Sequence, residues 1–177
     1  MTNDPRQRAA EYRQRVRRVA DALPRPVTAV VLDFDGVLTD NGVYFDETGR
    51  VLARCDRTDG LGVTFVRDAG VPILILSKTA NRIVSQRAGM LGIDVLSGID
   101  DKAPTLCAWA GERGIDLAGV VYCGNDTNDV GVMRVVGCAT APSDAHADAL
   151  EVAHIVLDFP GGRGAVRQLT DAVLLAR

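Results

Sequence analysis

Short, fully apolar segments alternate with segments of helical pattern through most of this 177-residue chain. Residues 27–33 (VTAVVLD) and 71–76 (VPILIL) have the continuous apolar pattern of strands that are buried on both faces. This alternation predicts an α/β fold, a Rossmann-like parallel sheet with helices on both faces. Ligands of such sheets bind beyond the carboxyl ends of the strands, so the residues that follow each strand are the candidate functional residues.

The expected secondary structure places a strand before most helices. Strands are predicted at residues 27–33, 71–76, 93–96, 120–123, 138–141 and 155–157. Helices are predicted at residues 59–69, 80–91, 102–113, 126–135, 145–152 and 165–175, and glycine ends several of them.

The segment after the first strand predicts a β-hairpin flap at about residues 43–54, with Gly49 in its turn. No large insertion follows the first or the third strand, so no large cap domain is expected. Residues 27–177 therefore form a single expected domain. An Arg-rich helix is expected within residues 1–26, ended by two prolines.

The composition is that of a globular domain and disfavours several other classes of protein. Hydrophobic residues make up 47% and charged residues 24%, which argues against disorder. No apolar run approaches the roughly 20 residues of a membrane span, and the N-terminus lacks a signal-peptide pattern. The net charge of −3 disfavours nucleic acid as a partner. The four cysteines form no paired motif, which favours a cytoplasmic protein without a disulfide framework.

Asp33 and Asp35 follow the first predicted strand. Side chains two residues apart on an extended backbone point the same way, so both carboxylates can face one cleft. Neighbouring carboxylates repel each other unless a cation lies between them, and Mg²⁺ suits carboxylate oxygens together with a substrate phosphate. A turn that simply favours Asp and Gly is the alternative interpretation.

A second group of oxygen-bearing side chains follows the fourth predicted strand, in the segment GNDTND at residues 124–129. A helix N-cap accounts for Asp126 or Thr127. It does not account for the whole group, whereas a metal-binding loop at the same edge of the sheet does.

Two further loops carry groups that can hold a phosphate. Ser77 and Lys78 follow the second predicted strand, where a hydroxyl and backbone N–H groups precede a helix. Lys102 opens a helix, where the helix dipole disfavours a cation. The chain has 20 basic residues and only two are lysine, Lys78 and Lys102, so a lysine at this position indicates a function for its compact charge.

Together the four loops indicate phosphoryl transfer. Asp33 can attack phosphorus and form an aspartyl phosphate, and Asp35 can act as general acid and then as general base. Lys102, Mg²⁺ and backbone N–H groups can stabilise the charge of the transition state.

These motifs resemble those of the haloacid dehalogenase-like phosphatases over residues 27–177. The matching features are DFDGVLTD at residues 33–40, Ser77, Lys102 and the GNDTND segment. The resemblance implies Asp33 as nucleophile, Asp35 as acid/base, and Mg²⁺ bound by both with Asn125 or Asp126. Motif position favours Asn125, and charge favours Asp126. The implied phosphate-binding residues are Asp33, Ser77, Lys78 and Lys102, with Gly36 and Asp129 in supporting roles.

Within that family the chain is similar to a capless branch. This branch contains 3-deoxy-D-manno-octulosonate 8-phosphate phosphatase and the phosphatase-like domain of acylneuraminate cytidylyltransferases. The similarity lies in residues 59–62, 98–102 and 161–167. It implies a homotetramer in which the hairpin and tail of neighbouring subunits cover the site. It also implies a 2-keto-3-deoxy sugar acid phosphate as substrate, in the biosynthesis of sialic acids or of the octulosonate, with candidate substrate contacts at Arg57, Thr58, Asp59, Arg87 and Arg163.

Several alternatives remain at this stage. The substrate can be another sugar phosphate, and the chain can be a non-catalytic oligomerisation module or a phosphate-binding regulatory domain. The presence of Asp33, Asp35, Ser77 and Lys102 favours an enzyme, because loss of activity most simply begins with the nucleophile. The sequence leaves the carbon count of the substrate open.

Overall fold

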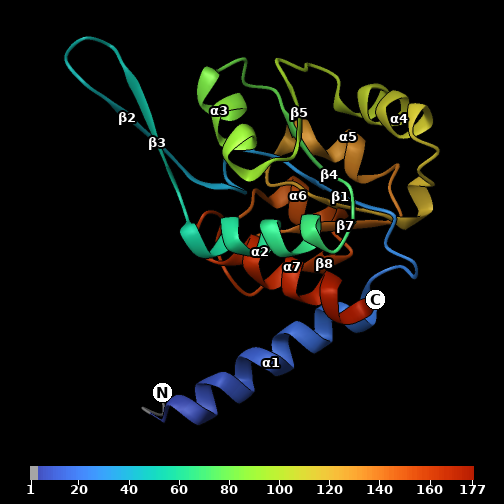
Figure 1. Ribbon diagram of the computed structural model, residues 1–177. Helices are drawn as coiled ribbons and strands as arrows, with labels where there is room; N and C mark the ends of the chain where they lie inside the picture. Colours follow the sequence, from blue (N-terminus) through green and yellow to red (C-terminus); the bar gives the residue numbers. More distant parts are fainter. Residues whose placement is uncertain (1–3) are drawn as a thin grey trace.

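A computed structural model describes residues 4–177 and shows a six-stranded sheet with helices on both faces (Figure 1). The strand order is β5-β4-β1-β6-β7-β8, and every pair is parallel. The strands are β1 (Ala29–Leu32), β4 (Ile73–Ser77), β5 (Asp94–Ser97), β6 (Val120–Cys123), β7 (Cys138–Ala141) and β8 (Ile155–Val156). The α/β fold predicted from the sequence is confirmed.

Two apolar clusters cover the two faces of the sheet. Val30 and Leu32 of β1 belong to one cluster, and Ala29 and Val31 belong to the other, as the two-residue repeat of a strand requires. The first cluster includes side chains of α2 (Arg57–Asp68), α3 (Arg82–Leu91) and α7 (Ala165–Ala176). The second includes side chains of α4 (Lys102–Glu112), α5 (Val130–Met133) and α6 (Ala147–Val152).

The first helix, α1 (Pro5–Ala22), begins at an Asp4 N-cap with proline in its first turn. Val16, Val19 and Ala20 join the first apolar cluster, and the rest of the helix extends from the body of the molecule (Figure 1). Among the helices of residues 4–177, none combines the length and apolar character needed to cross a membrane.

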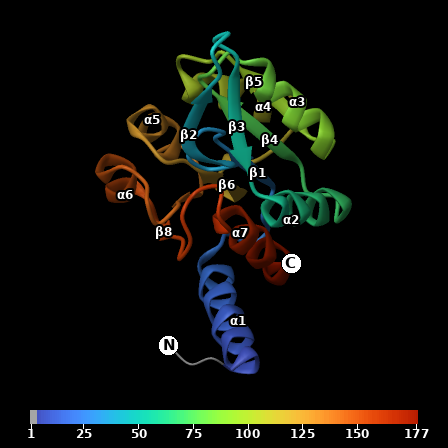
Figure 2. The ribbon, with the colours of Figure 1, turned by 90° about the vertical axis from the view of Figure 1, so that its left-hand side faces the viewer.

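The predicted hairpin is present and longer than expected. Strands β2 (Thr39–Phe45) and β3 (Val51–Cys55) pair antiparallel, with Val43 opposite Ala53. The hairpin stands away from the sheet (Figure 1), and its tip lies at the end of the molecule opposite α1 (Figure 2). No large cap domain accompanies it in the described part of the chain.

The helix predicted at residues 126–135 is present but shorter, and it is irregular at its start. The segment forms a single 3₁₀ turn, Thr127–Asp129, followed by the four-residue helix α5. The Asp129 carboxylate accepts hydrogen bonds from the backbone N–H groups of Asn125 and Asp126, which bends the loop around this side chain. The helix predicted from residue 80 begins two residues later, because Asn81 caps α3 and leaves Lys78 and Thr79 in a loop.

Candidate active site

The carboxyl ends of β4, β1 and β6 lie side by side and bring three of the predicted loops together. They surround a hollow of about 290 Å³. Its lining includes side chains from all three loops, namely Asp33, Asp35, Ser77, Lys78, Asn125 and Asp126. The neighbouring strands of a parallel sheet thus place the predicted carboxylates, hydroxyl and amide around one cavity.

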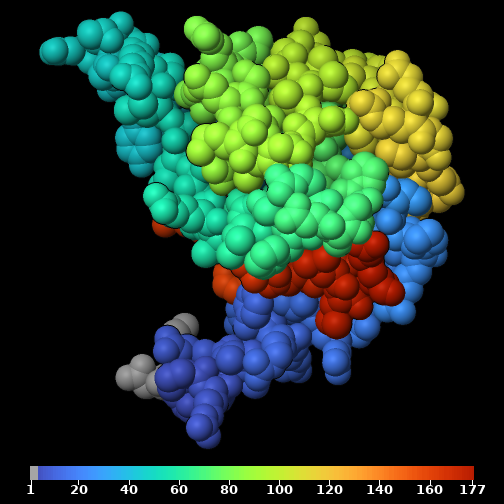
Figure 3. Space-filling model, in the orientation of Figure 1, coloured from blue at the N-terminus to red at the C-terminus, as the bar shows by residue number. Residues whose placement is uncertain are grey.

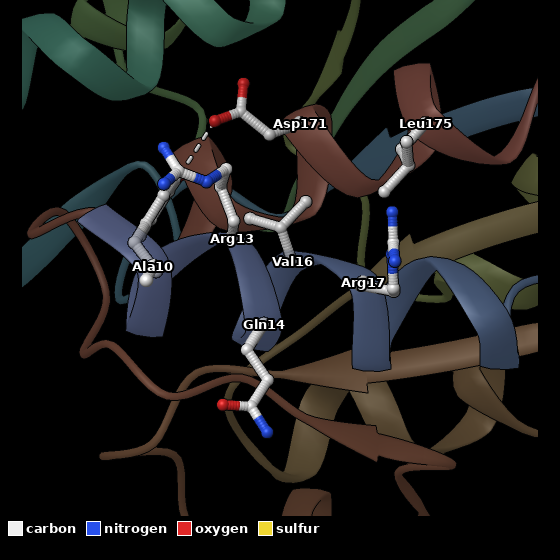
Figure 4. Close-up of a pocket in the computed structure, with 8 residues that line it drawn as sticks. Ala10, Arg13, Gln14, Val16, Arg17, Asp171 and Leu175 are labelled. Carbon is white, nitrogen blue, oxygen red and sulfur yellow. Dashed lines mark hydrogen bonds between the residues drawn. The ribbon is translucent and has the colours of Figure 1, made fainter. Parts of the chain in front are cut away.

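A larger hollow, of about 550 Å³, lies between α1 and α7 and contains none of these residues (Figure 4). Val16 of α1 and Leu175 of α7 lie along it. Its one lining carboxylate, Asp171, already accepts hydrogen bonds from the Tyr12 hydroxyl and from Arg167. The α1–α7 groove therefore lacks the groups that phosphoryl transfer requires.

Lys102 lies beneath the cavity between two carboxylates. Its Nζ is 2.8 Å from Asp33 Oδ1 and 2.6 Å from Asp129 Oδ1, and the residue is 2% exposed. Burial alone lowers the pKa of Lys102, but the charges of Asp33 and Asp129 outweigh burial and hold this pKa above its usual value. Lys102 therefore stays charged beside Asp33.

Burial acts in the opposite direction on Asp33. It raises the pKa of the Asp33 carboxyl group, and the charge of Asp129 raises this pKa further. The ammonium group of Lys102 opposes both effects only in part, and the pKa of Asp33 stays raised, at about 7. The ion pair with Lys102 is what favours the ionised form that a nucleophile requires.

Asp129 connects the lysine to the loop after β6. Its Oδ1 accepts hydrogen bonds from Lys102 and from the Tyr122 hydroxyl, at 2.6 and 2.7 Å. Its Oδ2 accepts from the backbone N–H of Asn125 at 2.8 Å. Asp129 thus lies behind the cavity and contacts Lys102, while its supporting role stays a prediction. The sequence analysis did not identify Tyr122, although a tyrosine within a fully buried strand needs a partner for its hydroxyl group.

The cavity offers oxygen atoms that suit a hard divalent cation. Within residues 4–177, no three Asp, Glu, His or Cys residues form a metal-binding group, so carboxylates alone do not provide the site. The Oδ1 atom of Asn125 is buried without a hydrogen-bond partner, beside Asp33 and Asp35 at the same cavity. Asp126 Oδ1 instead accepts from the backbone N–H of Thr127, as an N-cap does. The donor set of Asp33, Asp35 and Asn125 therefore fits Mg²⁺.

The expected phosphate-binding groups differ in exposure. Ser77 is buried at the end of β4, and its Oγ accepts a hydrogen bond from the backbone N–H of Thr79 at 3.1 Å. Lys78 is exposed at the cavity rim. Both can approach a phosphoryl group placed above Asp33.

The five candidate substrate residues lie outside the lining of this cavity. Arg57 and Thr58 are exposed at the start of α2, and Arg163 is exposed near Asp40. Arg87 is half-buried and donates to the backbone oxygen of Asp56.

Asp59 is fully buried, and its carboxylate accepts hydrogen bonds from the backbone N–H groups of Gly164 and Arg167. The expectation of a substrate contact at Asp59 is corrected on this ground. Both of its oxygens hold the N-terminus of α7, and neither is open to a ligand.

Gly36 provides a direct test of the Asn125 position. Its φ is +82°, and a Cβ atom there would lie 2.0 Å from Asn125 Nδ2. We expect Gly36→Ala to displace the Asn125 side chain and to raise the Mg²⁺ concentration needed for half-maximal activity by about tenfold or more, as for loss of a group that supports a metal ligand.

Gly70→Ala is the matched control for this test. Gly70 has a φ of +81°, and a Cβ atom there would meet nothing within 4 Å. The control carries the same backbone strain without the collision. Equal Mg²⁺ requirements of the two variants would contradict the placement of Asn125 at the metal.

The parallel sheet, the aspartate pair after β1 and the buried lysine beside it are features of the haloacid dehalogenase-like (HAD) hydrolases. No protein-family model matches the chain. The curated KdsC protein of Yersinia pestis, a 3-deoxy-D-manno-octulosonate 8-phosphate phosphatase, is 32% identical over 152 residues, which cover 85% of this chain and 81% of that protein.

Two solved structures share the fold. A HAD family hydrolase from Streptomyces avermitilis has 42% identity and a TM-score of 0.83, with 86% of this chain and 88% of that chain covered. The 3-deoxy-D-manno-octulosonate (KDO) 8-phosphate phosphatase of Moraxella catarrhalis, in complex with magnesium, phosphate and KDO, has 26% identity and a TM-score of 0.83. Here 92% of this chain and 91% of that chain are covered. The chain belongs to the KDO 8-phosphate phosphatase-like branch of the HAD superfamily, and it is a phosphoric monoester hydrolase.

Proposed function

We propose that the chain is a Mg²⁺-dependent phosphatase of a phosphorylated 2-keto-3-deoxy sugar acid, with KDO 8-phosphate as the first candidate substrate. The observation that carries this proposal is the buried Asp33–Lys102 pair beneath a cavity that also presents the unpartnered amide oxygen of Asn125. The relatives named for KDO 8-phosphate support the choice of substrate class.

The proposed reaction begins at Asp33. Its carboxylate attacks phosphorus and forms an aspartyl phosphate, while Asp35 donates a proton to the departing sugar oxygen. Asp35 then accepts a proton from the water that hydrolyses this intermediate. Lys102 holds Asp33 in place from beneath, and its charge stabilises the developing phosphoryl charge, while Ser77 and Lys78 line the cavity.

Asp33, Asp35 and Asn125 are the residues that would hold Mg²⁺. When bound, this ion neutralises charge on the phosphoryl oxygens. The buried carboxylate of Asp33 and the buried amide oxygen of Asn125 are hard ligands of the kind that it prefers.

The test is phosphate release by the purified protein across a panel of esters. The panel contains KDO 8-phosphate, a nonulosonate 9-phosphate and glucose 6-phosphate, each with Mg²⁺ and with excess EDTA. We expect metal-dependent turnover with a preference for the sugar acids. A preference for glucose 6-phosphate would overturn the substrate class, and full activity in EDTA would overturn the metal. A folded protein inactive on every ester would favour the non-catalytic oligomerisation module.

We also propose that the protein assembles as a homotetramer through the hairpin β2–β3. Val43, Tyr44, Phe45 and Leu52 are 56%, 55%, 70% and 47% exposed, and the hairpin stands apart from the body (Figure 3). An isolated two-stranded hairpin is marginally stable in water, so a neighbouring subunit that buries these side chains would stabilise it.

Phe45→Asp tests this assembly. We expect the variant to shift the mass measured by light scattering from tetramer toward smaller species, because a buried unpaired carboxylate is unfavourable at an apolar contact. Met90→Asp is the control, since Met90 is a comparably exposed apolar side chain, at 78%, near the C-terminal end of α3 and outside the hairpin strands. A wild-type monomer at micromolar concentration, or equal masses of wild type and Phe45→Asp, would contradict the proposal.

A further inference from the structure

The Asp35 carboxylate has a hydrogen-bond donor on a neighbouring loop. Thr79 Oγ1 donates to Asp35 Oδ2 at 2.8 Å, across a sequence separation of 44 residues. Within residues 4–177, no other group donates a hydrogen bond to the Asp35 carboxylate. Asp35 is only half-buried, so without this contact its side chain would be free to rotate.

The loop that carries Thr79 is held at both ends. The backbone N–H of Thr79 donates to Ser77 Oγ at 3.1 Å, and the Ser77 carbonyl accepts from Ile99 at 3.1 Å. At the other end, Asn81 caps α3 through its side chain. Thr79 is also β-branched, which restricts the rotation of its side chain. Although Thr79 is exposed, these contacts restrict the direction from which its hydroxyl group meets Asp35.

This hydrogen bond engages one oxygen of Asp35, Oδ2, and leaves Oδ1 clear of the loop. Because one oxygen is held, the rotation of the carboxyl group is restricted and its free oxygen keeps one direction. Alignment of this kind is what general acid catalysis requires.

We propose that Thr79 is a positioning residue that orients Asp35 as the general acid, an inference that rests on the proposed phosphatase function. In the step concerned, a bond forms between Asp33 and phosphorus, and the bond from phosphorus to the sugar oxygen breaks. The Asp35 proton moves to that oxygen, which leaves Asp35 as a carboxylate. The Thr79 hydroxyl group then donates to a charged acceptor, a stronger hydrogen bond than to a neutral one.

The test compares two leaving groups in Thr79→Val and Thr79→Ser. Valine has nearly the shape of threonine and no hydroxyl group, and serine keeps the hydroxyl group. One substrate is the sugar acid phosphate, whose alkoxide must be protonated as it leaves. The other is p-nitrophenyl phosphate, whose phenolate leaves without a proton. The kcat/KM value is used because it covers only the steps up to cleavage of the ester bond.

For Thr79→Val we expect kcat/KM to fall by about tenfold to a hundredfold on the sugar acid phosphate. This fall is smaller than the whole contribution of a general acid, because Asp35 is still present but is no longer held in place. On p-nitrophenyl phosphate we expect a fall of less than about threefold, because this reaction does not use the acid. Thr79→Ser should retain most of the activity on both substrates.

Equal losses on the two substrates in Thr79→Val would indicate a merely structural role and overturn the inference. No loss on either substrate, or a Thr79→Ser variant as impaired as Thr79→Val on the sugar ester, would overturn it as well. The wild-type enzyme tests the proposed function separately. If it hydrolyses p-nitrophenyl phosphate but no sugar acid phosphate, the proposed substrate class is wrong. The Thr79 variants are then compared on p-nitrophenyl phosphate and on the alkyl phosphate that the wild type hydrolyses fastest. If it hydrolyses neither kind of ester, both proposals fail.

Discussion

Replacing Asp33 by asparagine is expected to lower the rate of phosphate release at least about a thousandfold, as for loss of a covalent nucleophile. Asparagine keeps the shape of the side chain but removes the attacking carboxylate. The fold should persist, because Lys102 keeps its ion pair with Asp129. Burial raises the pKa of Asp33, so its charge is unfavourable in the folded protein, and the thermal midpoint of Asp33→Asn should equal or exceed that of the wild type.

Asp68→Asn is the matched control, because Asp68 is exposed at the end of α2 and, within residues 4–177, pairs with its neighbour Arg67 alone. Its activity should equal that of the wild type. Near-wild-type turnover by Asp33→Asn would exclude the aspartyl-phosphate mechanism. Mass spectrometry of the purified variant must first show that the asparagine has not deamidated to aspartate.

The second large effect is expected at Lys102, where both turnover and stability should fall. In Lys102→Ala, the carboxylates of Asp33 and Asp129 are left buried without their shared cation. Removal of one partner from a buried ion pair typically costs about 3–5 kcal/mol. Thermal unfolding should show this loss, and kcat should fall by at least about a hundredfold because a preorganised charge at the phosphoryl group is lost.

Lys102→Arg should not restore turnover, although arginine is the more common cation of this chain. The guanidinium group is planar and larger than an ammonium group, and Lys102 lies in a fully enclosed position. The double variant Lys102→Met with Asp129→Asn separates the two effects. Neutralising Asp129 should recover stability relative to Lys102→Met alone, without recovery of activity. Wild-type turnover by Lys102→Arg would exclude a catalytic role for the lysine.

Much of the sheet could be predicted because its strands are buried on both faces. β1 and β6 lie within the predicted apolar runs, and β4 extends one residue beyond its run. The alternation of strands with helices indicated that the strands are parallel. The loop after β6 could not be predicted in the same way. Asp126 and Asp129 form a capping box at its start, so the segment opens as a 3₁₀ turn and continues as a helix only to Met133, a length that the apolar pattern does not reveal.

The candidate site likewise has residues that the sequence could predict and contacts that it could not. Sequence reasoning placed Asp33, Asp35, Ser77 and Lys102 at strand or helix ends, where their chemistry could be inferred residue by residue. It could not choose between Asn125 and Asp126, because the choice depends on which oxygen is left without a partner after folding. Sequence reasoning also assigned Asp59 to the substrate. The burial of Asp59 beneath α7 depends on residues more than 100 positions away, so no pattern near Asp59 in the sequence indicates it.

The sequence alone determined the class of fold and the identity of the reactive groups, since apolar periodicity and residue type are local properties. Only the tertiary structure decided how these groups are paired. Lys102 serves two carboxylates that lie 69 and 27 residues away along the chain, and Thr79 reaches Asp35 across 44 residues. Such contacts depend on the order of strands in the sheet and on burial, because an ion pair or a hydrogen bond acts over a few ångströms in space and has no period along the chain.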